Sequence, residues 1–378
     1  LYTQVERERN FSKNIIDNAP IGIHLIDKNG NLILENPEMR QISGDIKGEF
    51  VGKNIFNLES IKNSLFFEIY QNALKGQRYI TENVPFIHEK THKESILNLS
   101  ITPIYDAGSV QQVLTMYFDN TEKARAQMKL KEAMNTISED LKMAKEIQMN
   151  LLKTDLTQFK NLNFCVEYLP MTEVGGDIYD IYEVSEGVTR IFLADATGHG
   201  VQAALTTMLI KSEFEKVKTF EIPVNQILEV MSKSFITKYK NLTVFFSCFI
   251  VDIDSNQQMI FYSSAGHPNQ YIIKDGELIE LKGGGKLVGL LEETKYNLYS
   301  HVIENKDKIF LFTDGLFEEF DQTGTELSET GLKGFITFHM KKSIHSLIEN
   351  ILKEVENWRG DNPINDDITV IGIEIIKD

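Results

Sequence analysis

The sequence predicts an α+β protein made of three consecutive parts, residues 1–118, 119–153 and 154–378. The first part holds short apolar runs that alternate with polar residues and end in glycine turns. The second part spaces its apolar residues alternately by three and four, and the third alternates long apolar runs with helical patterns. Because alternation is typical of half-buried strands and 3-4 spacing of helices, we expect an antiparallel sheet with flanking helices, a linker helix and a second sheet-containing unit.

Composition and charge exclude several classes of function. The formal net charge of −16 argues against a nucleic-acid partner, which needs a basic face, and it disfavours contact with an anionic membrane. No apolar run has the length of a membrane span. Cys165 and Cys248 lie in apolar runs, which is typical of reduced core thiols in a cytoplasmic protein. Because the chain begins at Leu1 within a helical pattern, we expect an engineered fragment of a longer protein.

Residues 1–118 predict one sheet. The run "IGIHLIDKNGNLIL" predicts two short strands around Asn29 and Gly30, since Asn-Gly supplies the positive φ of a tight hairpin turn. A helical pattern in "LFFEIYQNALKG" ends at Gly76, a residue type that often follows a helix. An antiparallel sheet of about five strands with helices on one face is the simplest arrangement. The remaining strand-like runs are residues 79–88, 95–105 and 111–118.

This first part resembles a PAS sensor domain over nearly its whole length. The resemblance rests on "IIDNAPIGIHLIDKNGNLILENPEMRQISG", "FVGKNIFNL" and "MYFDNTEKA". Domains of this family bind haem, flavin, a metabolite or nothing, so the resemblance leaves the PAS ligand unknown. The segment contains no cysteine, which excludes a flavin sensor with a photoreactive thiol. His24, His88 and His92 are more simply interpreted as strand and loop residues than as haem ligands.

The linker, residues 119–153, carries a heptad-like seam. Such spacing suits a parallel coiled coil, and a single amphipathic helix packing on its own protein is the alternative. A coiled coil would make the protein a homodimer through its PAS domain and linker helix. Gln148 is the polar member, which we expect to fix the register and so to be regulatory. The seam consists of Leu130, Met134, Ile137, Leu141, Ala144, Gln148 and Leu151.

Residues 154–378 predict sheets enclosed by helices. Several strand-like runs are almost continuously apolar, as expected when both faces of a sheet are covered. We therefore expect β-sheets between helical layers. The strand-like runs are residues 164–169, 188–195, 243–253, 259–264, 308–313 and 368–376, and the helical patterns are residues 200–217, 224–239 and 343–358.

Four aspartates of this last part lie at strand ends or in glycine turns. They are Asp177 in "VGGDIYD", Asp195 in "FLADATGHG", Asp314 in "IFLFTDGLFEEF" and Asp366 in "NDDITVIGIEI". Asp195 and Asp314 each precede a helical pattern, so either could instead be a helix N-cap. Four such placements favour a common cause. Oxygen ligands without histidine or cysteine clusters suit Mg²⁺ or Mn²⁺, and two such ions can activate a bridging water for attack on phosphorus.

The same part of the chain resembles the PPM-type metal-dependent serine/threonine phosphatases, in the bacterial branch that controls sporulation and general stress. The match covers about residues 144–377 and follows the family's order through "AKEIQMNLLK", "VGGDIYD", "DATGHGVQAAL", "SSAGHPNQYI", "LVGLLEE", "FLFTDGLFEE" and "DDITVIGIEI". The resemblance implies an αββα sandwich and hydrolysis of phosphoserine or phosphothreonine on a partner protein. It also implies that the partner is a STAS-type anti-sigma-factor antagonist.

Carried over residue by residue, the resemblance implies a site for two Mn²⁺ or Mg²⁺ ions. Asp195 would bridge both ions, and Asp177 and the backbone carbonyl of Ala196 would bind the second. Asp314 and Asp366 would complete the first. In this interpretation Asp195 and Asp314 are the catalytic ligands.

Alternatives remain at this point. His199 is a candidate general acid, although a turn histidine bonded to the backbone is the simpler interpretation for it and for His267. A signalling scaffold that binds the same partner without catalysis and a small-molecule phosphatase are the other candidate functions. The run "GGDIY" also resembles the signature of cyclic-dinucleotide synthases, but Ile178 breaks that signature.

The end of the linker is expected to act on the metal site. Its residues "EIQMNLLK" come directly before the catalytic part, and Ala203 and Ala204 leave room for another element to pack closely on the helix after Asp195. A shift of that helix would move Asp195 and Ala196. The state of the PAS domain would thereby set metal binding through the register of the linker.

Overall fold

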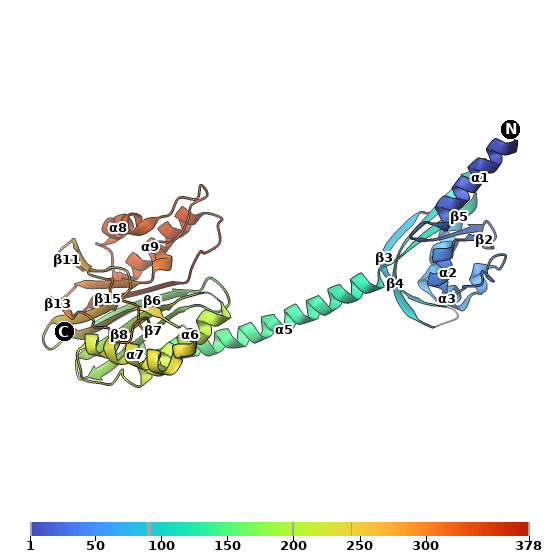
Figure 1. Ribbon diagram of the computed structural model, residues 1–378. Helices are drawn as coiled ribbons and strands as arrows, with labels where there is room; N and C mark the ends of the chain where they lie inside the picture. Colours follow the sequence, from blue (N-terminus) through green and yellow to red (C-terminus); the bar gives the residue numbers. More distant parts are fainter. Residues whose placement is uncertain (1, 89–91, 199, 243, 377–378) are drawn as a thin grey trace. The chain divides into compact units, whose positions relative to one another are not determined.

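The computed structural model describes residues 2–88, 92–198, 200–242 and 244–376. The chain forms two compact units, Leu1–Thr136 and Ile137–Asp378 (Figure 1). The division falls inside helix α5, Thr121–Leu152, whereas the sequence suggests breaks near residues 118 and 153. Within the described ranges no helix is long and apolar enough to cross a membrane.

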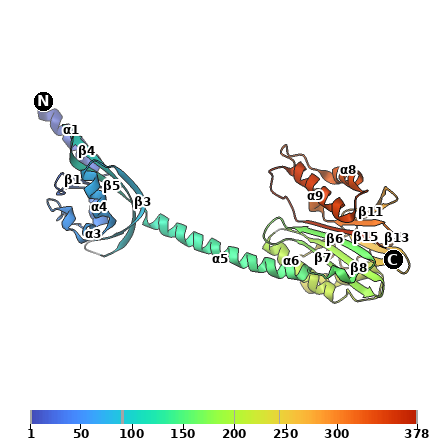
Figure 2. The same cartoon turned by 180° about the vertical axis from the view of Figure 1, so that it is seen from behind.

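The first unit is a five-stranded antiparallel sheet in the order β2-β1-β5-β4-β3 with helices packed on one face (Figures 1 and 2). The predicted hairpin is confirmed, and Gly30 makes its turn with a φ of 87°. The three strands predicted after it are confirmed as well. The elements are α1 (Tyr2–Asp17), β1 (Gly22–Asp27), β2 (Leu32–Glu35), α2 (Pro37–Ser43), η1 (Ile55–Asn57), α3 (Glu59–Lys62), α4 (Leu65–Leu74), β3 (Tyr79–Ile87), β4 (Glu94–Asp106) and β5 (Ser109–Asp119).

A buried polar cluster lies in the core of this unit. Nε2 of His24 is 2.8 Å from the Tyr70 hydroxyl, which also contacts the hydroxyls of Thr115 and Tyr117. Burial lowers the pKa of His24 to about 3, so its imidazole is neutral at physiological pH. Nε2 of His88 is 2.8 Å from the Ser95 hydroxyl. Both histidines therefore make hydrogen bonds within the protein, in agreement with their interpretation as strand and loop residues.

The second unit contains two five-stranded antiparallel sheets, β13-β10-β9-β8-β7 and β12-β11-β14-β15-β6. All six strand-like runs of the sequence become strands, and the three helical patterns become α6, α7 and α9. The elements are η2 (Leu156–Gln158), β6 (Leu162–Leu169), β7 (Asp177–Ser185), β8 (Val188–Ala196), α6 (Val201–Glu215), α7 (Val224–Tyr239), η3 (Lys240–Leu242), β9 (Phe246–Asp254), β10 (Met259–Ala265), β11 (Gln270–Lys274), β12 (Glu277–Leu281), β13 (Tyr299–Val302), β14 (Lys308–Phe312), η4 (Asp314–Leu316), α8 (Ser328–His339), α9 (Ile344–Arg359) and β15 (Ile368–Ile375).

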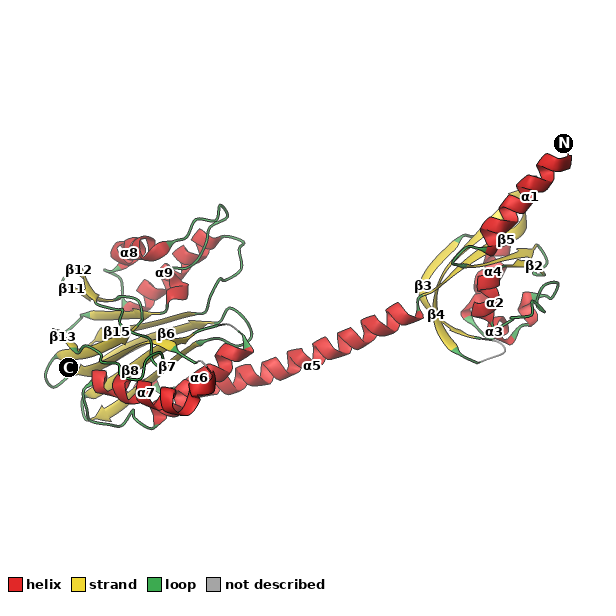
Figure 3. Cartoon of the chain, viewed as in Figure 1, coloured by secondary structure: helices red, strands yellow, loops and turns green. Residues whose placement is uncertain are grey.

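Three apolar layers hold the second unit together. The middle layer joins the two sheets, with Leu193 of β8 and Leu311 of β14 among its buried members. An outer layer packs α6 and α7 on the first sheet, and another packs α8 and α9 on the second. Helices therefore lie outside and strands inside (Figure 3). The order helix, sheet, sheet, helix is the sandwich predicted from the sequence, and it places the sheet ends where loops from both sheets meet.

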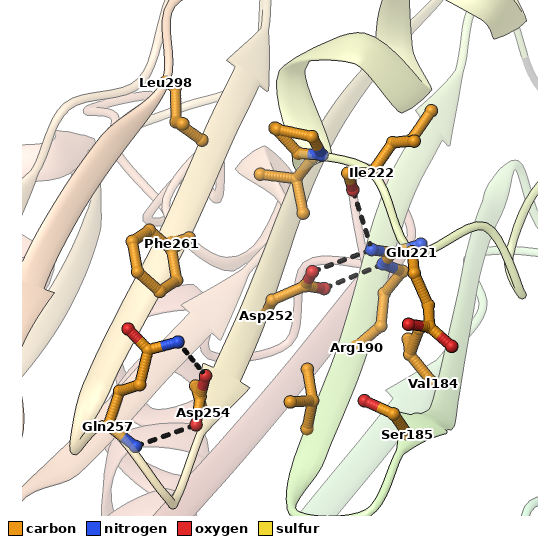
Figure 4. A pocket seen from close by; sticks show the side chains of 13 residues that line it. Val184, Ser185, Arg190, Glu221, Ile222, Asp252, Asp254, Gln257, Phe261 and Leu298 are labelled. Atoms are coloured by element: carbon orange, nitrogen blue, oxygen red, sulfur yellow. Dashed lines mark hydrogen bonds and ion pairs between the residues drawn. The ribbon is translucent and has the colours of Figure 1, made fainter.

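A buried ion pair ties the first of these sheets to the connection between α6 and α7. Nε and Nη2 of Arg190 each donate to a carboxylate oxygen of Asp252 at 2.7 Å. The guanidinium also donates to the carbonyls of Lys218, Phe220 and Ile222. Arg190, Asp252 and Ile222 border a pocket of about 310 Å³ (Figure 4). Because Arg190 uses all of its N–H groups, its charge is compensated within the protein.

Helix α5 changes its surroundings along its length. Leu130, Met134 and Ile137 are 61%, 62% and 59% exposed, whereas Gln148 is 3% exposed and Leu152 is buried in the α6–α7 layer. The seam predicted as one continuous stripe therefore faces solvent at its start and the second unit at its end. This corrects the interpretation of Gln148 as a seam residue, because its side chain is buried against the second unit.

Candidate active site

The strand register brings the predicted aspartates to one end of the two sheets. Asp177, the first residue of β7, pairs with Asp195 near the end of β8. Asp314 follows β14 and Asp366 precedes β15, and these two strands are also antiparallel neighbours. The end of one strand and the start of its antiparallel partner lie at the same end of the sheet. Four residues from distant parts of the sequence thus share one region.

Two hydroxyls join the sheets at this point. Thr313, which follows β14, donates from Oγ1 to Oδ2 of Asp177 at 2.7 Å, and Thr369 of β15 donates to the same oxygen at 2.6 Å. Asp177 belongs to one sheet, whereas Thr369 belongs to the other and Thr313 directly follows a strand of it. The side chain of Asp177, which is almost fully buried, is therefore fixed by the sheet that supplies Asp314 and Asp366.

The carboxylates repel one another. Burial raises the pKa of Asp177 well above its ordinary value, and the nearby Asp367 and Asp314 raise it further. Burial likewise raises the pKa of Asp195 well above its ordinary value, with Asp177 and Asp314 as the next causes. Burial and the charge of Asp366 raise the pKa of Asp314. The site therefore favours protonation or the arrival of positive charge.

Glycines allow the close approach of backbone in this region. A Cβ on Gly176 would lie 3.0 Å from the carbonyl oxygen of Ala196, and a Cβ on Gly315 would lie 2.1 Å from the carbonyl oxygen of Asp367. Side chains at these positions would push apart the loops that carry the aspartates. Gly198 and Gly200 have φ values of 102° and 69°, so they form the turn into α6 that the sequence predicts.

Sequence reasoning did not single out Asp367. Its Oδ1 accepts the N–H of Met171 at 2.6 Å and its Oδ2 accepts the N–H of Gly176. Asp367 thus ties the start of β15 to the loop that leads into Asp177. The adjacent acidic pair in "NDDIT" is the only trace of this arrangement in the sequence, because the bonded partners are separated by 191 residues or more.

Gln148 contacts two parts of the site region. Its Nε2 donates to the carbonyl of Gly175 at 2.7 Å and to the hydroxyl of Thr207 on α6 at 3.1 Å. Its Oε1 accepts the N–H of Gly175 at 3.1 Å. The end of α5 is therefore hydrogen-bonded to α6 and to the loop that precedes Asp177. Ala203 and Ala204 of α6 are buried, as expected.

The two histidines considered from the sequence differ in what the structure describes. His267 is buried, with Nδ1 at 2.8 Å from the Ser247 hydroxyl and Nε2 at 3.1 Å from the carbonyl of Phe312. Because a carbonyl only accepts, Nε2 carries the proton and Nδ1 accepts from Ser247. His267 is thus a structural residue bonded to the backbone, as predicted. His199 lies outside the described residues.

The donor set suits a hard divalent cation. Carboxylate oxygens and the Ala196 carbonyl are the ligands that Mg²⁺ and Mn²⁺ prefer. None of the ion pairs formed by the described residues involves the four aspartates, so their charge has no side-chain counterpart there. Among those same residues no three acidic, imidazole or thiol side chains converge into a complete set of metal ligands. Binding an ion would therefore require these side chains to move together.

Comparison with known families shows which family the chain belongs to. The sequence profile of the family described as Stage II sporulation protein E (SpoIIE) matches residues 185–376, which is just over half of the chain. The chain belongs to the SpoIIE family. This membership makes it a serine phosphatase of the PP2C type, a hydrolase that acts on phosphoserine or phosphothreonine. The matched region includes Asp195, Asp314 and Asp366, while Asp177 and Gln148 precede it.

Individual relatives of this SpoIIE-family chain agree with that assignment. Phosphoserine phosphatase RsbU of Bacillus subtilis (strain 168) is 25% identical over 310 residues, which are 80% of this chain and 90% of RsbU. Phosphoserine phosphatase RsbP of the same organism is 22% identical over 240 residues, or 62% of this chain and 58% of RsbP. The SiaA-PP2C domain of Pseudomonas aeruginosa superposes with a TM-score of 0.58 at 24% identity, over 64% of this chain and 98% of that domain. The last likeness establishes a PP2C fold.

Proposed function

We propose that this SpoIIE-family chain dephosphorylates a STAS-type anti-sigma-factor antagonist under the control of its N-terminal unit. The observation that supports the catalytic part is the placement of Asp177, Asp195, Asp314 and Asp366 at one end of the two sheets. The similarity to RsbU and RsbP, which are named phosphoserine phosphatases, supports a phosphoserine substrate, and the STAS-type partner comes from the family resemblance of the sequence. The cytoplasm is the compartment in which such a partner would be met.

The five ligands assigned from the sequence form the proposed metal site. In this proposal Asp195 would be shared by two Mn²⁺ or Mg²⁺ ions, Asp177 and the carbonyl of Ala196 would hold the second, and Asp314 and Asp366 would hold the first. Such ions, when bound, would lower the pKa of a water for attack on the phosphorus. The protein's own part is to hold these oxygens in place, and Asp195 and Asp314 are the ligands on which activity depends most.

The first unit is the proposed sensor. Its strand order, β2-β1-β5-β4-β3 with helices on one face, supports the assignment as a PAS domain made from the sequence motifs. Its ligand is unknown. The proposed domains are the PAS domain at residues 1–118, the linker at 119–153 and the phosphatase at 154–378, and the proposed assembly is a homodimer formed through the PAS domain and the linker helix.

Gln148 is the proposed regulatory residue. Its hydrogen bonds to Gly175 and Thr207 link the end of the linker to α6 and to the loop before Asp177. A rotation or shift of the linker would move Gly175 and α6, and with them Asp177, Asp195 and the Ala196 carbonyl. The PAS state would then shift the population between a metal-binding arrangement and a disassembled one.

The test is dephosphorylation of a purified phosphorylated STAS-type partner by the full chain and by residues 137–378. We expect phosphate release with Mn²⁺, none after chelation, and a rate that differs between the two proteins. Metabolite phosphates serve as competing substrates and should turn over far more slowly. Release from metabolites but not from the phosphoprotein would contradict the proposed substrate class, and equal rates with and without residues 1–136 would contradict the regulatory role.

A further inference from the structure

A short segment after Asp314 lies against the loop that carries Asp366. Nδ2 of Asn365 donates to the carbonyl of Glu318 at 3.1 Å. Nδ2 of Asn362 donates to the carbonyls of Phe320 and Asp321 at 3.0 and 2.9 Å. These amide side chains lie at or near the surface, where water competes for the same bonds. They connect the loop to the segment after Asp314.

Glu319 makes the buried contact in this region. It is 0% exposed, and its Oε1 accepts the backbone N–H of Asn365 at 3.1 Å. Asn365 directly precedes Asp366, so the bond fixes the peptide that carries this aspartate. The N–H of Asp367 then donates to Oδ1 of Asp366 at 2.7 Å, which orients the carboxylate. Glu319 is therefore connected to Asp366 through two hydrogen bonds. The first fixes the backbone of Asn365, and the second orients the carboxylate of Asp366.

Glu319 is not one of the five proposed metal ligands, and its contact with the site runs through the backbone of Asn365. Its side chain has no exposed surface, and among the described residues its Oε2 has no hydrogen-bond partner. A buried carboxylate with one orphaned oxygen is costly for stability. Glu319 is therefore poorly explained as a residue that stabilises the fold. Its hydrogen bond to the N–H of Asn365 points to a role in placing Asp366 instead.

We propose that Glu319 is a positioning residue for Asp366, and that it raises the affinity of the site for the metal ion that Asp366 and Asp314 share. The proposal rests on the metal site proposed above. Groups that orient a metal ligand through a hydrogen bond typically account for about 10- to 100-fold in metal affinity. Asp314 and Glu319 belong to the same short segment, so this segment supplies one ligand and aligns the other.

Two variants of the full chain separate positioning from stability. Glu319→Met removes the acceptor with little change in volume, and Glu319→Gln retains an acceptor oxygen. We expect Glu319→Met to weaken Mn²⁺ binding about tenfold or more, measured directly by calorimetry and by electron paramagnetic resonance of free Mn²⁺. At saturating Mn²⁺ its kcat should stay within about threefold of the parent, because the ligands themselves are present. Glu319→Gln should restore most of the affinity.

Thermal unfolding without metal supplies the second measurement. Because an apolar side chain replaces a buried carboxyl group, the metal-free Tm of Glu319→Met should be equal to or above that of the parent. A large fall in this Tm, or Mn²⁺ affinity equal to the parent, would overturn the positioning role. Glu349→Leu, an exposed glutamate of α9, is the matched control and should change neither quantity.

Asp366→Asn distinguishes this inference from the proposed function. If Asp366→Asn loses Mn²⁺ binding while Glu319→Met retains it, the positioning role of Glu319 fails and the metal site stands. If Asp366→Asn binds Mn²⁺ as tightly as the parent, the proposed metal site itself is wrong at this residue.

Discussion

Asp177 and Asp195 are direct register partners across the antiparallel strands β7 and β8. Side chains at such positions lie on the same face of the sheet with Cβ atoms about 5 Å apart, and like charges there are destabilising. The sandwich thus retains an unfavourable pair next to Asp314 and Asp366. The arrangement becomes favourable when a cation lies between the carboxylates, so function and stability should respond in opposite directions to loss of charge.

The first prediction concerns the opposite responses of activity and stability to the loss of a carboxylate charge. Asp195→Ala and Asp314→Ala should each lower phosphatase activity by about a hundredfold or more, because they remove a ligand that generates the hydroxide. Asp195→Asn should do the same while keeping the shape of the side chain, and its metal-free Tm should rise by about 2–4 °C for each kcal/mol of repulsion relieved. Phosphate release and thermal unfolding in chelator measure both. Near-normal turnover of either alanine variant with Mn²⁺ would refute the two-metal site.

The second prediction concerns the hydroxyls that hold Asp177. Thr313→Val and Thr369→Val each remove a hydrogen bond to its Oδ2 and leave a buried carboxylate with fewer partners, a loss of about 1–3 kcal/mol. We expect lower stability and a higher Mn²⁺ requirement from both. Thr313→Ser and Thr369→Ser keep the hydroxyl and serve as controls. Urea unfolding together with Mn²⁺ titration of activity provides the comparison, and serine variants as impaired as the valine variants would rule out the hydroxyl as the cause.

Much of the second unit could be predicted because most of its strands are apolar runs and the candidate aspartates lie at or next to the strand ends. Strand β7 was missed, since "DIYDIYEVS" mixes charged residues into the alternation. Helix α8 was missed because Gly331 and Gly334 lower its intrinsic helix propensity, and packing of Leu332 and Ile336 on the second sheet stabilises it instead. The short strands β11, β12 and β13 were missed as well.

The residues that hold the candidate site in place could not be predicted. Asp367 and Glu319 act through bonds to backbone N–H groups of distant or neighbouring loops, and such bonds leave no periodicity in the sequence. Gln148 shows a different limit. Periodicity identifies the stripe of a helix that will be covered, but it does not say whether a second helix or the protein's own domain covers it.

The third prediction follows from the observed contacts of Gln148. Gln148→Leu leaves the N–H and carbonyl of Gly175 without their partners, which weakens the link from α5 to the loop before Asp177. We expect the Mn²⁺ concentration for half-maximal activity to rise by about tenfold, equivalent to about 1.4 kcal/mol. Met149→Leu, on the exposed side of the same turn, is the control. Unchanged metal dependence in Gln148→Leu would make the end of the linker a passive tether.

The fourth prediction concerns pH. Burial lowers the pKa of His267 to about 4, from an ordinary value of 6.5. The unfolded chain therefore binds this proton more tightly than the folded one. Its contribution to stability is complete above pH 6.5, declines as the pH falls towards 4, and is then constant, a total of about 3 kcal/mol.

A variant that cannot titrate isolates this contribution. His267→Gln should be less stable than the parent at pH 7, and the difference in unfolding free energy should shrink between pH 7 and pH 4, because only the parent loses the histidine contribution. Urea unfolding in chelator at four pH values measures the difference, and the acidic cluster cancels because both proteins contain it. A difference that stays constant with pH would show that His267 is not held neutral.

The fifth prediction concerns assembly. Leu130, Met134 and Ile137 lie on one face of α5 and are exposed, which is unfavourable for a helix that remains alone in water and suits a parallel coiled coil. We expect the full chain to sediment as a dimer at micromolar concentration and the double variant Leu130→Glu/Ile137→Glu to sediment as a monomer, since like charges would face each other across the seam.

Met128→Glu is the matched control. Met128 is 65% exposed but lies on the opposite side of the helix, about 160° from Leu130 at 100° per residue, so the substitution should leave the dimer intact. A parent chain that is monomeric would mean that the linker acts on Gly175 and α6 within a single chain. A double variant that is monomeric yet keeps the parent's Mn²⁺ dependence would separate dimer formation from control of the site.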